Sequence, residues 1–136
     1  MAYLVPSMAH LLKTTLCLAG ALLAVVGVQH FTASPVVLQA SVDSVAGNGE
    51  WLTLRADGTF DHTSAGLFSE TITHGRYTRT DRLIQLDRLP EEGALQRKTL
   101  RVSASPAFET GKGLWQVGST GRIDSTLTGL RIVYHE

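Results

Sequence analysis

Residues 51–60 read WLTLRADGTF, and this stretch decides the fold class. Leu52 and Leu54 alternate with polar residues, as in a strand with one apolar and one polar face. Asp57-Gly58 then separates this run from a second extended run that begins with Thr59-Phe60. An Asp-Gly pair between two such runs is typical of a β-hairpin, because glycine adopts positive φ at no steric cost. The stretch therefore predicts a hairpin that places Phe60 in the core.

Short extended stretches of the same kind continue to the end of the chain, divided by turn residues such as those of 90–93. Together with the hairpin they predict about seven short strands and no helix, which is typical of an all-β meander, sandwich or small barrel. Connections this short favour antiparallel neighbours. We expect one β domain over residues 50–136, with its later strands at 72–80, 83–86, 100–104, 115–117 and 130–134.

The N-terminal region, residues 1–31, is expected to be a membrane anchor or a signal segment. Residues 14–28 carry no charge and form an apolar core of about 15 residues, which flanking apolar positions extend to about 21, enough for one membrane span. Signal peptidase requires small residues at −3 and −1, and cleavage after Ala33 would place Phe31 at −3. We therefore favour an uncleaved single-pass anchor over a cleaved signal peptide, which would leave a secreted domain.

Orientation and linkage follow from the flanking residues. Lys13 precedes the apolar core, and no Lys or Arg follows it before Arg55. The positive-inside rule then places the N-terminus in the cytoplasm and the domain in the periplasm or outside the cell. Residues 32–49 are expected to be a tether, in which the β-prone segment 35–38 can add an edge strand and 46–49 form a turn.

Charge and cysteine content exclude several functions. The chain has 12 Lys and Arg against 12 Asp and Glu, so it has no excess positive charge for binding nucleic acid. Its one cysteine, Cys17, lies in the apolar segment, so the β domain can form no disulfide. Thr14-Thr15-Leu16 precede Cys17 where a lipoprotein signal would have small residues just before the cysteine, so lipid attachment is not expected.

Three segments of the domain resemble a known group. Residues 51–60, Gly75-Arg76-Tyr77 and residues 81–86 are similar to the D-G-T-F, G-x-Y and D-x-I-x-L pattern of small lipocalin-like bacterial envelope proteins, including the N-terminal barrel of copper-resistance lipoproteins. The resemblance spans residues 51–86 and implies a β-barrel in the cell envelope. This chain lacks the lipoprotein cysteine and the Cys-x-x-Cys motif of the copper proteins, so the resemblance implies no activity.

His62 and His74, with Asp61 and Glu70 nearby, are the best candidates for metal ligands. If Phe60 faces the core, His62 shares its face and His74 points to the opposite face. We therefore expect solvated histidines at strand ends and no metal site. The domain has no Gly-x-Ser-x-Gly motif and no cysteine nucleophile, so we expect no catalytic residues, no cofactor and no enzymatic activity.

Basic residues concentrate in the middle of the domain, interleaved with acidic ones. This pattern favours cross-strand ion pairs on a solvated face, with a patch for anions or lipid headgroups as the alternative. Trp51 and Trp115 are out of phase with the neighbouring leucines, and either can lie on the outer face. The basic residues are Arg76, Arg79, Arg82, Arg88, Arg97, Lys98 and Arg101.

Two functions fit these features. The first is a membrane-tethered, non-enzymatic binding or interaction module for an unknown envelope protein or ligand. The second is a lipocalin-like carrier of a small apolar ligand. They differ in the domain interior, since a carrier needs a cavity of a few hundred Å³, whereas an interaction module fills its core with side chains.

Overall fold

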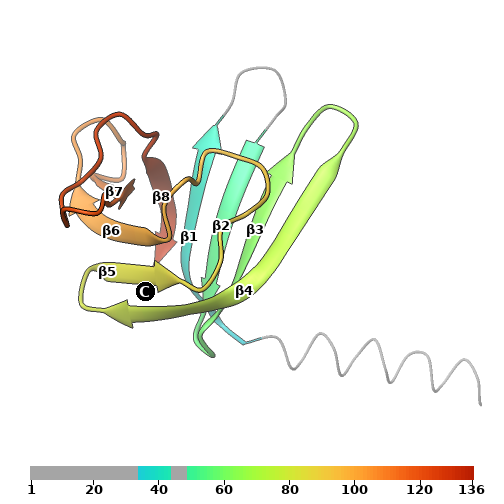
Figure 1. The fold of residues 1–136 in the computed structure, drawn as a ribbon, viewed down its shortest axis with the longest axis horizontal. Helices are drawn as coiled ribbons and strands as arrows, with labels where there is room; N and C mark the ends of the chain where they lie inside the picture. The colour runs from blue at the N-terminus through green and yellow to red at the C-terminus, as the bar shows by residue number, and fades with distance from the viewer. Residues whose placement is uncertain (1–33, 44–48) are drawn as a thin grey trace, which may run out of the picture. The chain divides into compact units, whose positions relative to one another are not determined.

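The computed structural model describes residues 34–43 and 49–136, which form a closed antiparallel β-barrel (Figure 1). Each strand pairs with the next in sequence, and the last strand pairs with the first. The all-β prediction is confirmed, and of the meander, the sandwich and the small barrel that the sequence left open, the fold is the barrel. The strands are β1 (Val36–Asp43), β2 (Gly49–Arg55), β3 (Thr59–Ala65), β4 (Glu70–Thr80), β5 (Leu83–Leu86), β6 (Thr99–Ala104), β7 (Lys112–Gln116) and β8 (Leu130–His135).

β1 corresponds to the β-prone segment 35–38 that the sequence marks as a candidate edge strand, and it is longer, reaching Asp43. It lies within the expected tether, yet it is no edge strand, because Ala40 pairs with Leu52 of β2 and with Ile132 of β8. The barrel unit accordingly begins at Ser34 rather than at residue 50. Strict alternation does not mark β1, because the adjacent residues Ala40 and Ser41 are both buried where the pairing with β8 shifts register between Gln39 and Ala40.

Two sequence predictions fall outside the described residues. These are the apolar N-terminal helix and most of the turn cluster at 46–49. Within 34–43 and 49–136 there is no helix with the length and apolarity needed to cross a membrane.

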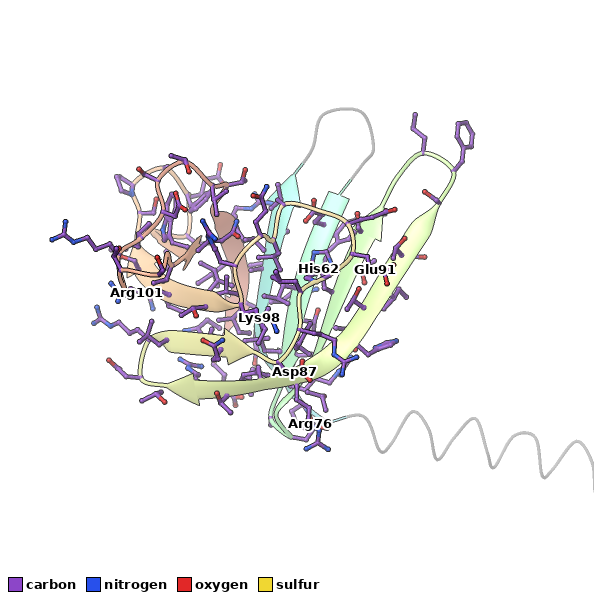
Figure 2. The ribbon with its side chains drawn as sticks, viewed as in Figure 1. His62, Arg76, Asp87, Glu91, Lys98 and Arg101 are labelled. Atoms are coloured by element: carbon purple, nitrogen blue, oxygen red, sulfur yellow. The ribbon has the colours of Figure 1, made fainter. Side chains whose placement is uncertain are left out.

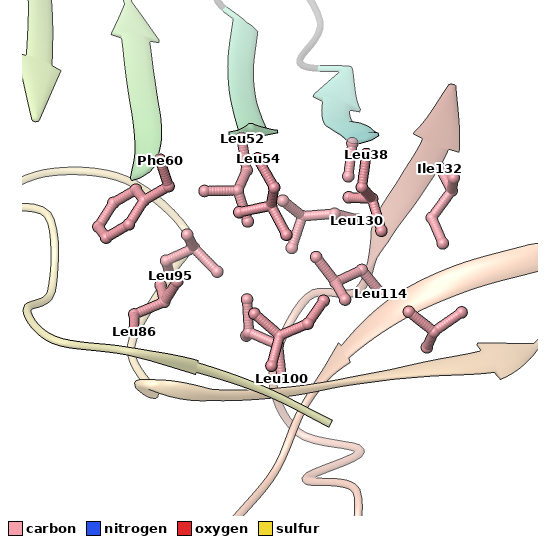
Figure 3. Packing of buried hydrophobic residues seen from close by; sticks show 13 residues of the cluster. Leu38, Leu52, Leu54, Phe60, Leu86, Leu95, Leu100, Leu114, Leu130 and Ile132 are labelled. Carbon is pink, nitrogen blue, oxygen red and sulfur yellow. The ribbon is translucent and has the colours of Figure 1, made fainter. Parts of the chain in front are cut away.

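The interior of the barrel is packed with side chains (Figure 3). Every strand except β4 contributes at least one fully buried residue, and Leu95 adds a side chain from the β5–β6 loop. An eight-stranded barrel has an interior about wide enough for its own side chains to fill. The core consists of Leu38, Ala40, Leu52, Leu54, Phe60, Ile84, Leu86, Leu95, Leu100, Val102, Leu114, Leu130 and Ile132.

The predicted hairpin is present as β2–β3. Gly58 has φ 79°, and Phe60 is fully buried, which confirms both predictions. Opposite Phe60 on β4 lies Gly75, and a Cβ at that position would come 2.4 Å from Cε1 of the Phe60 ring. The glycine therefore provides the space in which the ring lies.

β4 changes partner just after this glycine. It pairs with β3 as far as Arg76 and with β5 from Tyr77 onward. Asp87 supports the change, because its backbone N–H donates to the Arg76 carbonyl at 2.9 Å and its Oδ1 accepts from the Arg76 N–H at 3.0 Å. In this way one 11-residue strand belongs to both halves of the barrel wall.

Candidate functional site

One end of the barrel is covered by the β5–β6 loop, residues 87–98, which runs past β1, β2 and β3 (Figure 1). Leu95 inserts from this loop into the core and is 4% exposed. Glu50 of β2 fixes the loop, since both of its carboxylate oxygens accept from the Ala94 N–H at 2.8 Å. The loop therefore acts as a fixed cover.

Gln116 holds the same loop from the opposite side of the barrel. Its side chain is fully buried, and its Oε1 accepts from the N–H groups of Gln96 and Arg97 at 2.7 and 3.0 Å. Its Nε2 donates to the carbonyls of Ala94 and Thr128 at 2.8 and 3.0 Å. All of the amide's usual hydrogen-bonding groups are thus used, and losing them would leave buried polar atoms without partners.

His62 lies inside the barrel, beside the β5–β6 loop (Figure 2). It is 1% exposed, so the prediction of a solvated strand-end histidine is wrong for this residue. The alternation of β3 correctly placed His62 on the face of Phe60, but this end of the strand is not open to solvent, because Glu50 contacts His62 and also holds the β5–β6 loop. Nε2 lies 3.3 Å from Oε2 of Glu50, and because a carboxylate only accepts, the proton of neutral His62 is on Nε2.

His74 points away from the barrel, as predicted. Its Nδ1 lies 2.7 Å from Oδ1 of Asp61, and its side chain is 73% exposed. The two histidines are thus on opposite faces of the barrel wall and cannot bind the same metal ion. In the part of the chain that the structure describes, no group of three His, Cys, Asp or Glu side chains is placed to hold a metal ion.

Burial lowers the pKa of His62 below its ordinary value of 6.5, and the hydrogen bond and charge of Glu50 oppose this shift without overcoming it. The unfolded chain therefore takes up a proton at this residue before the folded chain does. As pH falls below 6.5, the free energy of unfolding decreases. Burial, followed by the charges of Arg79 and Lys112, also lowers the pKa of His135, which adds a contribution of the same sign.

The opposite end of the barrel receives the chain from the N-terminal side. Arg55 Nη1 donates to the Ser34 carbonyl at 3.1 Å, and the Asp57 N–H donates to Ser34 Oγ at 3.0 Å. At the same end, the Tyr77 hydroxyl donates to the Arg55 carbonyl at 2.8 Å and so links β4 to the end of β2. Ser34, the first residue of the barrel unit, is thereby held at this end.

The predicted cross-strand ion pairs do not form among the seven basic residues. Within the described ranges, two of the seven have a carboxylate within 4 Å, Arg88 with Asp87 and Arg97 with Asp124, and neither pair joins two strands. Three others donate to backbone carbonyls: Lys98 to that of Asp87 (both labelled in Figure 2), Arg101 to that of Gly121, and Arg79 to that of Asp81. Both ion pairs thus join loop residues, while Arg76, Arg79 and Arg101 are on strands and have no carboxylate within 4 Å among the described residues.

Four large apolar side chains are exposed near the covered end of the barrel. We call Trp51, Leu67, Phe68 and Ile72 the apolar tip; their exposed fractions are 39%, 69%, 100% and 50%. Leu67 and Phe68 form the β3–β4 turn, while Trp51 and Ile72 are aligned through Thr63 across the outer face. The turn pair is a signal that sequence analysis missed, since hairpin turns are normally polar.

Trp115 is also on the outer face, between the inward-facing Leu114 and Gln116. It packs with its ring centre 5.9 Å from that of Phe108, and it lies over Gly129. Both tryptophans are therefore outside the barrel, which resolves the alternative left open by the sequence. Trp115 is half-covered by the folded-back β6–β7 loop, whereas Trp51 belongs to the exposed tip.

Comparison of the chain with protein-family models, with curated proteins and with solved structures gives no match. The class of protein defined by its own geometry is a closed, eight-stranded, side-chain-filled barrel with a covered end and an exposed apolar turn.

Proposed function

We propose that the chain is a membrane-tethered, extracytoplasmic, non-enzymatic interaction module that docks an envelope protein through the apolar tip. The observation that carries this proposal is the full exposure of Phe68 beside Leu67, 69% exposed, on a hairpin turn. Exposed apolar side chains that gather on a soluble surface are typical of a docking site. The proposed membrane anchor is the N-terminal segment 1–31, whose apolar core is residues 14–28.

The direction of the strands supports this assignment. Ser34 binds at the turn that precedes β3, and the apolar tip follows the other end of β3. Seven residues of strand separate these two points by about 20 Å. Ser34, the first residue of the barrel unit, and the apolar tip are thus at opposite ends of β3.

The chemistry of the tip indicates what it would bind. Its turn contributes one aromatic and one aliphatic side chain without a neighbouring cation, and Glu70 is the nearest charge in sequence. Two adjacent apolar side chains fit a shallow apolar groove on a protein, where a buried aromatic often supplies much of the binding energy. Ile72 and Trp51 extend the contact along the outer wall.

The packed interior argues against the alternative function of a carrier. The five hollows described on the barrel unit, of about 270–410 Å³, each have exposed residues in their walls and therefore open on the surface. An apolar ligand would have to displace Leu95 and the loop that Glu50 and Gln116 hold. The carrier function is consequently the weaker of the two.

Site-specific photocrosslinking of the full chain in its native membranes tests the proposal. A benzophenone amino acid replaces Phe68 in one variant and the exposed Thr78, near the other end of β4, in a matched control. We expect a discrete protein adduct at position 68 that is absent at 78 and is reduced when Leu67→Ser is added. Equal labelling at both positions, adducts to lipid alone, or an adduct insensitive to Leu67→Ser would contradict docking through the tip.

A further inference from the structure

A second surface feature is a pocket of about 360 Å³ beside the β4–β5 turn, at the opposite end of the barrel from the apolar tip. The strands β4, β6, β7 and β8 contribute to it near their ends. Its basic side chains are Arg79 from β4, Arg82 from the turn after β4, and Lys112 from the start of β7, and His135 lies at the end of β8. These residues are distant in sequence, and the closure of the barrel gathers them.

The pocket has an excess of positive charge. Arg79, Arg82 and Lys112 line it together with a single acidic residue, Asp81. The five ion pairs found within the described residues involve none of these three cations. The pocket therefore has two more cationic than anionic side chains, and none of its cations is matched by a carboxylate at contact distance within that part of the chain.

Arg79 is already held in place. Its Nε donates to the Asp81 carbonyl at 3.1 Å, and its Nη2 donates to Nε2 of His135 at 2.9 Å. A guanidinium can only donate, so His135 accepts through Nε2. The lowered pKa of His135 agrees with this arrangement, because burial, followed by the charges of Arg79 and Lys112, opposes its protonation. A guanidinium fixed in advance loses less conformational freedom when an anion binds.

The remaining walls suit a small anionic group. Val102 and Ala104 provide apolar surface, Ser103 carries a hydroxyl group, and Gly111, at φ 66°, has no atom within 4 Å of where a Cβ would project. Arginine and lysine together are the side chains that proteins use most to bind phosphate. We propose that this pocket binds a phosphate group, carried by the headgroup of an anionic lipid or by a free phosphate compound.

The lipid source rests on the proposed membrane attachment, whereas phosphate binding itself does not. β8 places His135 opposite Leu38, and the Glu136 N–H donates to the Val37 carbonyl at 3.0 Å. The pocket is thus at the same end of the barrel as Ser34, where the chain arrives from its N-terminal segment. The segment proposed as the membrane anchor joins the barrel at this end, and headgroup phosphates are the anions that a bilayer supplies.

The experiment uses the full chain in a non-ionic detergent and follows the arginine side-chain N–H signals by NMR. One arm adds glycerol 1-phosphate, and the other adds phosphatidylglycerol to the micelles, with phosphatidylcholine as the reference lipid. We expect saturable shifts of the Arg79 and Arg82 signals. Saturation in the first arm identifies a free phosphate compound as sufficient, and saturation in the second alone identifies a lipid headgroup.

Two double variants separate the pocket from general charge attraction. Arg82→Gln with Lys112→Gln should weaken binding by about tenfold or more, since each removes a charged hydrogen-bond donor. Arg88→Gln with Arg122→Gln removes the same charge from loops at the covered end and should change affinity by less than about threefold. No saturable shift in either arm, or equal loss in both double variants, overturns the proposal. Either result leaves the apolar tip untested and unaffected, so the two proposals fail separately.

Discussion

Phe60 and Gly75 form the contact on which we expect barrel stability to depend most directly. Phe60→Ala removes a fully buried ring and should lower the free energy of unfolding by about 3–5 kcal/mol. Gly75→Ala places a Cβ 2.4 Å from Cε1 of that ring and 2.6 Å from Oδ1 of Asp87, so it should cost about 1–3 kcal/mol through overpacking. Each cost is a substantial fraction of the total free energy of unfolding of a domain, which is typically about 5–15 kcal/mol.

The double variant gives the sharper test. Once Phe60→Ala has removed the ring, the Cβ of Gly75→Ala enters the space that the ring occupied. The two costs should therefore sum to more than the cost of the double variant, by about 1 kcal/mol or more. Urea unfolding of the Ser34–Glu136 fragment, followed by circular dichroism, measures all four corners of the cycle. Strict additivity would refute the reasoning, because it would mean that the ring does not limit the space at position 75.

Three further predictions use the same fragment or the full chain. The fragment 34–136 should unfold cooperatively, whereas 48–136, which lacks β1, should not, as thermal melts followed by circular dichroism can show. In urea titrations the free energy of unfolding should fall between pH 6.5 and about 5, by at most about 1.4 kcal/mol per pH unit for each of His62 and His135. His62→Gln should make this fall shallower. A free energy of unfolding that does not change with pH in the unaltered chain contradicts the lowered pKa values. The full chain should resist carbonate extraction from membranes and retain residue 1, whereas a soluble form starting between residues 32 and 41 would show cleavage.

Local chemistry made much of the barrel wall predictable. Asp57-Gly58 fixed a hairpin because only glycine takes its φ without strain, and Phe60 followed two residues later on the inward face. All of the strands expected after residue 50 are present within a residue or two of their predicted ends, except that β7 begins earlier, at Lys112. Period-two alternation is a property of each strand alone, so the sequence displays it directly.

Features that depend on distant pairing were not predictable. β1 became a strand because both β2 and β8 offered it hydrogen-bonding partners, and neither is visible from residues 36–43. The buried state of His62 depends on Glu50 and on a loop more than 25 residues further along the chain. The pocket around Arg79 is likewise assembled only by closure, which brings Lys112 and His135 to the end of β4.

The position of β1 also determines how the barrel would bear tension. In a chain tethered through its N-terminal segment, a pull enters at Ser34 and runs along β1. This strand is bonded on both sides, to β2 and to β8, and Arg55 and Asp57 secure its first residues. A partner held at the apolar tip would pull from the other end of the neighbouring strands, so the load acts in shear along β1. The hydrogen bonds of β1 to both neighbours would then have to break together before the barrel opened, so the barrel should resist a load applied between Ser34 and the apolar tip.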